Sequence, residues 1–242
     1  MRILAIESSA VTASVAILTD DTLTAEYTIN YKKTHSQTLL PMLDELVKMT
    51  ELDLDTIDAI AVAAGPGSFT GLRIGSATAK GLGLALKKPL VEIPTVDALA
   101  YNLYDSRALI CPIMDARRSQ VYTGIYRFQE HKLVTVEAQM AVPMAEMIEK
   151  LNARGEEVVF LGDGVPVFGK MIQENLKVPY SFAPAHVNKQ RAAAVAALGE
   201  IYMKEGKIVT AMEHVPEYLR VSQAERERAQ KLQEEKASEK NS

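Results

Sequence analysis

A glycine-rich stretch is the segment of this 242-residue sequence with the clearest chemical potential. It reads Gly65-Pro66-Gly67-Ser68-Phe69-Thr70-Gly71-Leu72-Arg73-Ile74-Gly75. Glycines leave backbone N–H groups accessible, and a helix N-terminus that follows such a loop favours phosphate. The stretch is not a P-loop, because no Gly-Lys-Ser/Thr follows it. Its spacing favours a second interpretation, in which the glycines allow the following helix to pack closely against a neighbour.

Two strand ends carry polar residues that could join the same chemistry. Glu7-Ser8-Ser9 follows an apolar run, and Asp115-Ala116-Arg117-Arg118 follows another. Hydroxyls at such a turn could hold phosphate or metal, and the two arginines could meet a small anion, a partner's acid or RNA phosphate. An ordinary solvated turn is the alternative at both places. A candidate nucleotide or phosphate loop is formed by Glu7, Ser8, Ser9, Gly65, Gly67, Ser68 and Arg73.

The histidines and the cysteine offer little further chemistry. The histidines are His35, His131, His186 and His214, and none is three or four residues from another, as a helical metal-binding pair requires. Cys111 lies in an apolar run and is expected to be a buried small hydrophobe. The sequence has no Gly-x-Ser-x-Gly elbow and no Cys/His metal spacing. It therefore predicts no nucleophile–base pair and no metal site.

The elements that position these residues occur in the same order twice. Strands are predicted over 3–6, 14–18, 23–29 and 59–63, and again over 109–113, 121–126, 133–136 and 158–161. In each half a strand ends in an acid, and a later strand ends in Gly-x-Gly and leads into a helix. We predict two copies of one β-β-β-α-β-α unit, facing each other across a cleft; the alternative is an ordinary mixed α/β chain. A helix over 188–204 is expected to cover the second sheet.

Composition and charge limit the classes of function. Apolar residues make up 48% and charged residues 24%, as in soluble globular proteins, and the net charge is −4. Autonomous nucleic-acid binders are usually basic, so RNA would be reached only through a local patch or a partner. The sequence shows neither a signal peptide nor an apolar run of membrane-spanning length, so we expect a cytoplasmic protein without a membrane contact.

Four segments together resemble one protein family. They are Ile3-Leu4-Ala5-Ile6-Glu7-Ser8-Ser9, His35-Ser36 with Leu39-Leu40-Pro41, the glycine-rich stretch, and Pro216-Glu217-Tyr218-Leu219-Arg220. This combination resembles the TsaB (YeaZ) family of bacterial tRNA threonylcarbamoyladenosine biosynthesis proteins. The resemblance implies an α/β fold of two actin/Hsp70-like (ASKHA, RNase H-like) lobes, with mixed five-stranded sheets flanked by helices. We assign the lobes to 1–104 and 105–216. Residues 217–242 are expected to be a charged helix or tail that packs toward the first lobe and then becomes disordered.

The resemblance also implies a role. Such proteins work with a TsaD-like paralogue and a TsaE-like ATPase to move a threonylcarbamoyl group from threonylcarbamoyl-AMP to N6 of adenosine 37. The tRNAs are those that read codons beginning with A. TsaD-like proteins hold a metal with a His-x-x-x-His pair, and the matching positions here are Thr95 and Leu99. The resemblance thus implies a non-catalytic subunit without a cofactor, which reaches tRNA through the complex.

In the family the first-lobe helices contact the TsaD-like partner or, alternatively, form a homodimer. The candidate interface residues are Leu39, Leu40, Leu43, Leu46, Val47, Leu72, Ser76 and Lys80. The same apolar stripe could instead cover the lobe's own sheet. The alternative function is an ASKHA-type nucleotide-binding phosphotransferase or ATPase, in which Glu7, Asp115 and Asp163 are candidates to hold magnesium.

Overall fold

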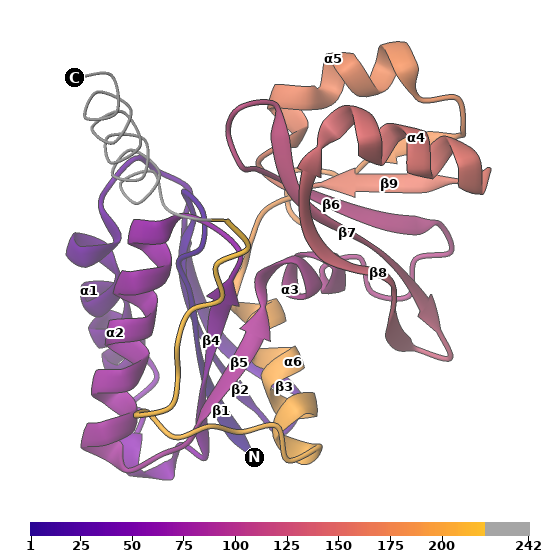
Figure 1. Cartoon of the computed structure of the whole chain (residues 1–242). Helices are drawn as coiled ribbons and strands as arrows, with labels where there is room; N and C mark the ends of the chain where they lie inside the picture. Colours follow the sequence, from indigo (N-terminus) through magenta and orange to yellow (C-terminus); the bar gives the residue numbers. More distant parts are fainter. Residues whose placement is uncertain (221–242) are drawn as a thin grey trace, which may run out of the picture.

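The computed structural model describes residues 1–220, which form two five-stranded sheets with helices on both faces of each (Figure 1). Of the predicted tail, residues 221–242 lie outside the described residues. None of the helices within 1–220 is both long enough and apolar enough to span a membrane.

The two sheets have the same topology. The first sheet has the order β3-β2-β1-β4-β5, formed by β1 (Arg2–Glu7), β2 (Ala13–Thr19), β3 (Thr22–Ile29), β4 (Ala59–Gly65) and β5 (Leu90–Pro94). The second has the order β10-β9-β6-β7-β8, formed by β6 (Leu109–Asp115), β7 (Gln120–Gln129), β8 (Lys132–Pro143), β9 (Val158–Leu161) and β10 (Tyr180–Phe182). In both, the first three strands pair antiparallel and the other two join in parallel. The predicted duplication is confirmed.

Helices cover one face of each sheet in the way the repeat predicts. Helices α1 (His35–Met49) and α2 (Phe69–Leu86) pack side by side on the first sheet (Figure 1). Their apolar side chains meet β1 and β4 in one core. Helices α4 (Met144–Arg154) and α5 (Val165–Asn175) cover the second sheet in the same way. A short 3-10 turn (Leu54–Thr56) precedes β4.

The other two helices each pack on the sheet of the opposite half of the sequence. This corrects the expectation that the helix predicted over 188–204 covers the second sheet. Helix α6 (Ala192–Lys204) packs on the first sheet, through Val195 and Leu198, and not on the second. Helix α3 (Thr95–Tyr101), from the first half of the sequence, packs on the second sheet through Val96 and Leu99, and its Ala98 also contacts the core of the first sheet. The physical reason lies in β1 and β4, which are buried on both faces and so need a second layer of helix. Helix α3 has only seven residues, and the longer α6 supplies this layer.

The chain then returns to the first lobe. Residues 207–220, which we call the C-terminal strap, run alongside α2 (Figure 1). The strap is fixed by backbone bonds between Val209 and Leu90 and by His214. His214 is fully buried, donates from Nδ1 to Glu92 at 2.6 Å and shares a 2.8 Å hydrogen bond with the Ser76 hydroxyl. The strap therefore forms part of the surface of the first lobe.

Candidate functional site

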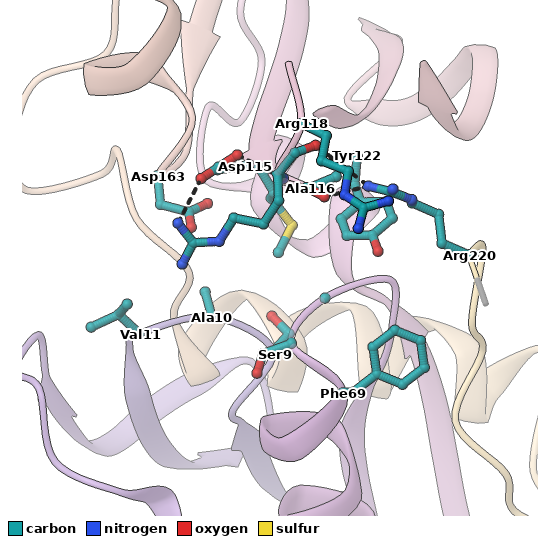
Figure 2. A pocket seen from close by; sticks show the side chains of 14 residues that line it. Ser9, Ala10, Val11, Phe69, Asp115, Ala116, Arg118, Tyr122, Asp163 and Arg220 are labelled. Carbon is teal, nitrogen blue, oxygen red and sulfur yellow. Dashed lines mark hydrogen bonds and ion pairs between the residues drawn. The ribbon is translucent and has the colours of Figure 1, made fainter. Parts of the chain in front are cut away.

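A cleft of about 330 Å³ lies between the two lobes. The first lobe supplies the β1–β2 turn and the N-terminus of α2, and the second lobe supplies the β6–β7 turn and the loop after β9 (Figure 2). Side chains from both lobes point into it, and Arg220 reaches it from the end of the strap. The lining residues include Ser9, Gly67, Ser68, Phe69, Asp115, Arg117, Arg118, Tyr122, Asp163 and Arg220.

The floor of the cleft uses its polar groups internally. The Ser9 backbone N–H and hydroxyl both donate to Glu7 Oε1, each at 2.6 Å. The Ser8 hydroxyl donates to the Gly71 carbonyl at 2.9 Å. A Cβ on Gly67 would lie 2.3 Å from the Ser9 carbonyl, and one on Gly71 would lie 2.1 Å from the Ser8 carbonyl. These glycines therefore let α2 approach the β1–β2 turn, as the packing interpretation requires.

Glu7 is the most strongly perturbed acid in this region. Its side chain is buried, and its second oxygen, Oε2, has no hydrogen-bond partner within the described residues. Burial raises the pKa of the Glu7 carboxyl to about 7 from an ordinary 4.5, and the nearby Asp163 charge raises it further. Burial also raises the pKa of Asp163. The Glu7 carboxyl at the floor of the cleft therefore gains or loses its proton near neutral pH.

The raised pKa of Glu7 predicts a stability that falls with pH. The folded state holds a proton that the unfolded state releases near pH 4.5, so stability is lost as pH rises from 4.5 through 7. The shift corresponds to about 3 kcal/mol. Glu7→Gln keeps an oxygen that can accept from Ser9 but does not titrate. We expect the free energy of unfolding in urea to fall between pH 5 and pH 8, by about 2.5 kcal/mol more in the unmodified protein than in this variant. Equal pH dependence in both would contradict the assignment.

The positive charge of the cleft comes from residues outside the candidate phosphate loop. Arg73 does not line the cleft; its Nε donates to the Tyr218 hydroxyl at 3.3 Å. Arg117, Arg118 and Arg220 line it instead. In the sequence, Arg117 and Arg118 of the segment Asp115-Ala116-Arg117-Arg118 are already identifiable as residues that could bind an anion. Arg220 enters only because the strap folds back, and its Nη1 donates to the Ala116 carbonyl.

Most of the candidate interface residues lie inside the first lobe. Leu39, Leu43 and Leu46 belong to the core under α1, and Leu72 is also buried. Ser76 is hydrogen-bonded to His214, and Lys80 donates to the His214 carbonyl at 2.8 Å. Val47 packs against the same core, whereas Leu40 is 55% exposed. The alternative in which the stripe covers its own sheet accounts for most of these side chains.

A different face of the two helices is open. Its apolar and small residues are Leu40 and Pro41 of α1, and Ala77, Gly81 and Leu84 of α2. A Cβ added to Gly81 would meet no atom within 4 Å. Glycine in a helix interior costs about 0.5–1 kcal/mol relative to alanine, and no contact inside this lobe requires it here. This open face is the part of the first-lobe helices that a partner could reach.

The two positions that the resemblance matches to metal-binding histidines are deeply buried. Thr95 and Leu99 lie on α3, and Leu99 packs in the apolar cluster of the second sheet. Residues 1–220 contain no group of three or more His, Cys, Asp or Glu side chains placed to hold a metal. Cys111 is buried, and burial raises the pKa of its thiol to about 12. This thiol is therefore protonated at neutral pH.

Comparison with known proteins identifies the family. The family model described as "TsaD: tRNA N6-adenosine threonylcarbamoyltransferase" matches residues 22–228. The tRNA threonylcarbamoyladenosine biosynthesis protein TsaB of Bacillus subtilis is 36% identical over 225 residues, which cover 93% of this chain and 96% of that protein. The Escherichia coli protein of the same name is 31% identical, covering 91% and 95%.

A solved structure agrees with these relatives. YeaZ from Pseudomonas aeruginosa superposes with a TM-score of 0.78 at 26% identity, covering 90% of this chain and 99% of that one. The duplicated fold described above is therefore shared with YeaZ along almost the whole chain. On these matches, the chain belongs to the TsaB (YeaZ) family of tRNA threonylcarbamoyladenosine biosynthesis proteins, which is related to TsaD.

Proposed function

We propose that this protein is the non-catalytic subunit that activates a TsaD-like paralogue, together with a TsaE-like ATPase. The complex would transfer the threonylcarbamoyl group from threonylcarbamoyl-AMP to N6 of adenosine 37, in tRNAs reading codons that begin with A. The observation that carries the proposal is the nearly full-length match to TsaB relatives. Leu99, which the resemblance matches to a metal ligand of TsaD-like proteins, is buried in an apolar cluster. Because tRNA is modified in the cytoplasm, we place the protein there.

The division of labour follows from the chemistry of α3. Leucine has no donor atom for a metal, and Leu99 packs with Val96, Ile110 and Met114 in an apolar cluster. A metal at this place would need polar ligands and water, and would lose its hydration against hydrocarbon side chains. The chain would therefore contribute by binding, and the TsaD-like subunit would supply the metal and the reaction.

The open face of α1 and α2 supports the pairing. Ala77 and Gly81 lie along one side of α2, and Leu40 and Pro41 lie along α1. Small residues allow two helices to approach closely, and exposed leucine side chains supply apolar area. A stable interface buries about 1,200–2,000 Å² in total. Two helices per partner would supply such an area. A homodimer would use the same face and would compete with the TsaD-like partner.

Size-exclusion chromatography with a purified TsaD-like protein tests the pairing. At micromolar concentrations of both, we expect one co-eluting complex, with any homodimer decreasing as the partner is added. Separate elution of the two proteins at these concentrations would contradict the proposed role.

A further inference from the structure

We propose that the mouth of the interlobe cleft contacts a single-stranded segment of the substrate tRNA. The contact surface comprises Arg73, Arg117, Arg118 and Arg220 with the paired rings of Phe69 and Tyr218; we call it the arginine surface. The inference rests on the proposed function, because that function makes tRNA the substrate. It adds a direct RNA contact to a subunit whose net charge is −4.

The first argument is uncompensated charge. Within the described residues, Arg118 has no ion pair or hydrogen bond, and Arg220 donates only to the Ala116 and Arg117 carbonyls. Arg117 pairs with Asp115 at 3.3 Å, but its side chain remains 88% exposed. Asp163, the other acid in the cleft, has a pKa raised by burial, which disfavours its charge. Among residues 1–220 the surface therefore carries more guanidinium groups than acids that pair with them, and guanidinium groups suit phosphate oxygens.

The second argument is the shape of the β6–β7 turn. Arg117, Arg118 and Ser119 have φ values of 64°, 56° and 58°, so three consecutive residues adopt the left-handed conformation. Each costs roughly 1–2 kcal/mol relative to the right-handed region. The Asp115 carboxylate accepts from the Arg117 backbone N–H at 2.8 Å and helps to hold this turn. The turn directs Arg118 toward the cleft mouth, opposite Phe69 of the first lobe (Figure 2).

The third argument is the aromatic pair beside the arginines. The rings of Phe69 and Tyr218 stack at 4.6 Å between centroids, and the Arg73 guanidinium lies 6.0 Å from the centre of the Tyr218 ring. Phe69 lines the cleft, and Tyr218 is 38% exposed. Aromatic faces and guanidinium planes stack on unpaired bases, while neighbouring arginines bind the phosphates. This combination favours RNA over an acidic protein surface.

The size of the cleft favours a single strand. A volume of about 330 Å³ suits a group the size of one nucleotide. A duplex would present its phosphates on a cylinder far wider than this mouth, and its bases would be stacked and paired. An unpaired loop can place one phosphate or base at the cleft and its neighbours along the Arg73 side.

Charge reversal at the turn tests the proposal. The variant Arg117→Glu/Arg118→Glu is compared with Lys132→Glu/Lys177→Glu, which makes the same change in net charge at exposed positions of the same lobe. The conservative variant Arg117→Lys/Arg118→Lys keeps the charge. Each is assembled with the TsaD-like partner, and fluorescence anisotropy measures the affinity for an unmodified, labelled tRNA across a range of salt concentrations.

We expect the reversal to weaken tRNA binding by at least about tenfold near 0.1 M salt. It should also reduce the slope of log affinity against log salt by about 1.4, because each of two lost single-strand phosphate contacts contributes about 0.7 to the slope. The lysine pair should keep most of the slope, and the control reversal should change neither quantity. Melting temperatures and partner affinity should be unchanged in all three variants.

Three outcomes would overturn the inference. The first is a tRNA affinity and salt slope equal to those of the control reversal. The second is a loss of partner affinity without tRNA, which would make the surface a protein interface. The third is that the isolated protein binds ATP with submillimolar affinity, that the reversal abolishes this binding, and that the salt dependence of tRNA binding does not change. The arginine surface would then be a nucleotide-binding site. In each case modification that still depends on this subunit would leave the proposed function standing.

Discussion

Gly65→Ala is expected to destabilise the protein by at least about 3 kcal/mol. Gly65 ends β4 with φ at +122°, a conformation that costs an L-residue about 1–3 kcal/mol. An added Cβ would also lie 2.2 Å from the Glu217 carbonyl oxygen. That oxygen cannot move freely, because the Glu217 N–H is bonded to the Ala64 carbonyl at 2.7 Å. The variant must either strain β4 or displace the strap.

Two other glycines separate these contributions. Gly155 has φ at +70° and open space around it, so Gly155→Ala carries only the conformational cost, about 1 kcal/mol. Gly81 has neither a positive φ nor a close neighbour at the Cβ position, so Gly81→Ala should increase the free energy of unfolding by about 0.5–1 kcal/mol. Urea midpoints should therefore decrease in the order Gly81→Ala, unmodified protein, Gly155→Ala, Gly65→Ala. Equal losses at 65 and 155 would show that the strap contributes little to the stability of the first lobe.

Gly81→Arg is expected to weaken association with a TsaD-like partner by at least about a hundredfold. Because no atom lies within 4 Å of the added Cβ, the side chain fits the isolated subunit without a clash. At an interface where helices approach closely, the same side chain would separate them and leave its charge without a partner. The loss corresponds to about 3 kcal/mol of binding free energy.

The control for this variant is Gly169→Arg. Gly169 also lies within a helix, α5 of the second lobe, with open space at its Cβ. Isothermal titration calorimetry should show normal association for Gly169→Arg and strongly reduced association for Gly81→Arg. Analytical ultracentrifugation of each variant alone should show that Gly81→Arg weakens any homodimer more than Gly169→Arg does. Equal affinities in both variants would remove the open face of α1 and α2 from the interface. Leu43→Asp is a poor probe, because Leu43 is a core residue and its loss would disturb folding.

The duplicated fold could be predicted because both halves repeat the same local signals. Gly65 ends β4 with φ at +122°, and Gly162 directly follows the equivalent strand β9 with φ at +109°. The repeated Gly-x-Gly therefore reflects a repeated backbone requirement. The place of α6 could not be predicted in this way. Its apolar residues show that one face is covered, but not which sheet covers it. The division into lobes after residues 104 and 216 stays a prediction.

The candidate site was only partly visible in the sequence. Adjacent arginines at 117 and 118 are a local signal, whereas Arg220 reaches the cleft only through the path of the strap. The apolar stripe of α1 does not show which of its leucines point outward. Leu39 and Leu40 are neighbours in sequence, yet one is in the core and the other is 55% exposed. A periodic pattern fixes a helix face to within about one residue, and the surrounding packing determines the rest.

The most direct test of the central claim is reconstitution of the modification with this subunit left out. The reaction would contain threonylcarbamoyl-AMP, the TsaD-like and TsaE-like proteins and an unmodified tRNA, and modified adenosine 37 would be measured by mass spectrometry of nucleosides. We predict that modification over many turnovers requires this protein, that it shows no activity alone, and that Gly169→Arg restores the reaction while Gly81→Arg does not. Equal modification with and without the protein would contradict its role as an activating subunit.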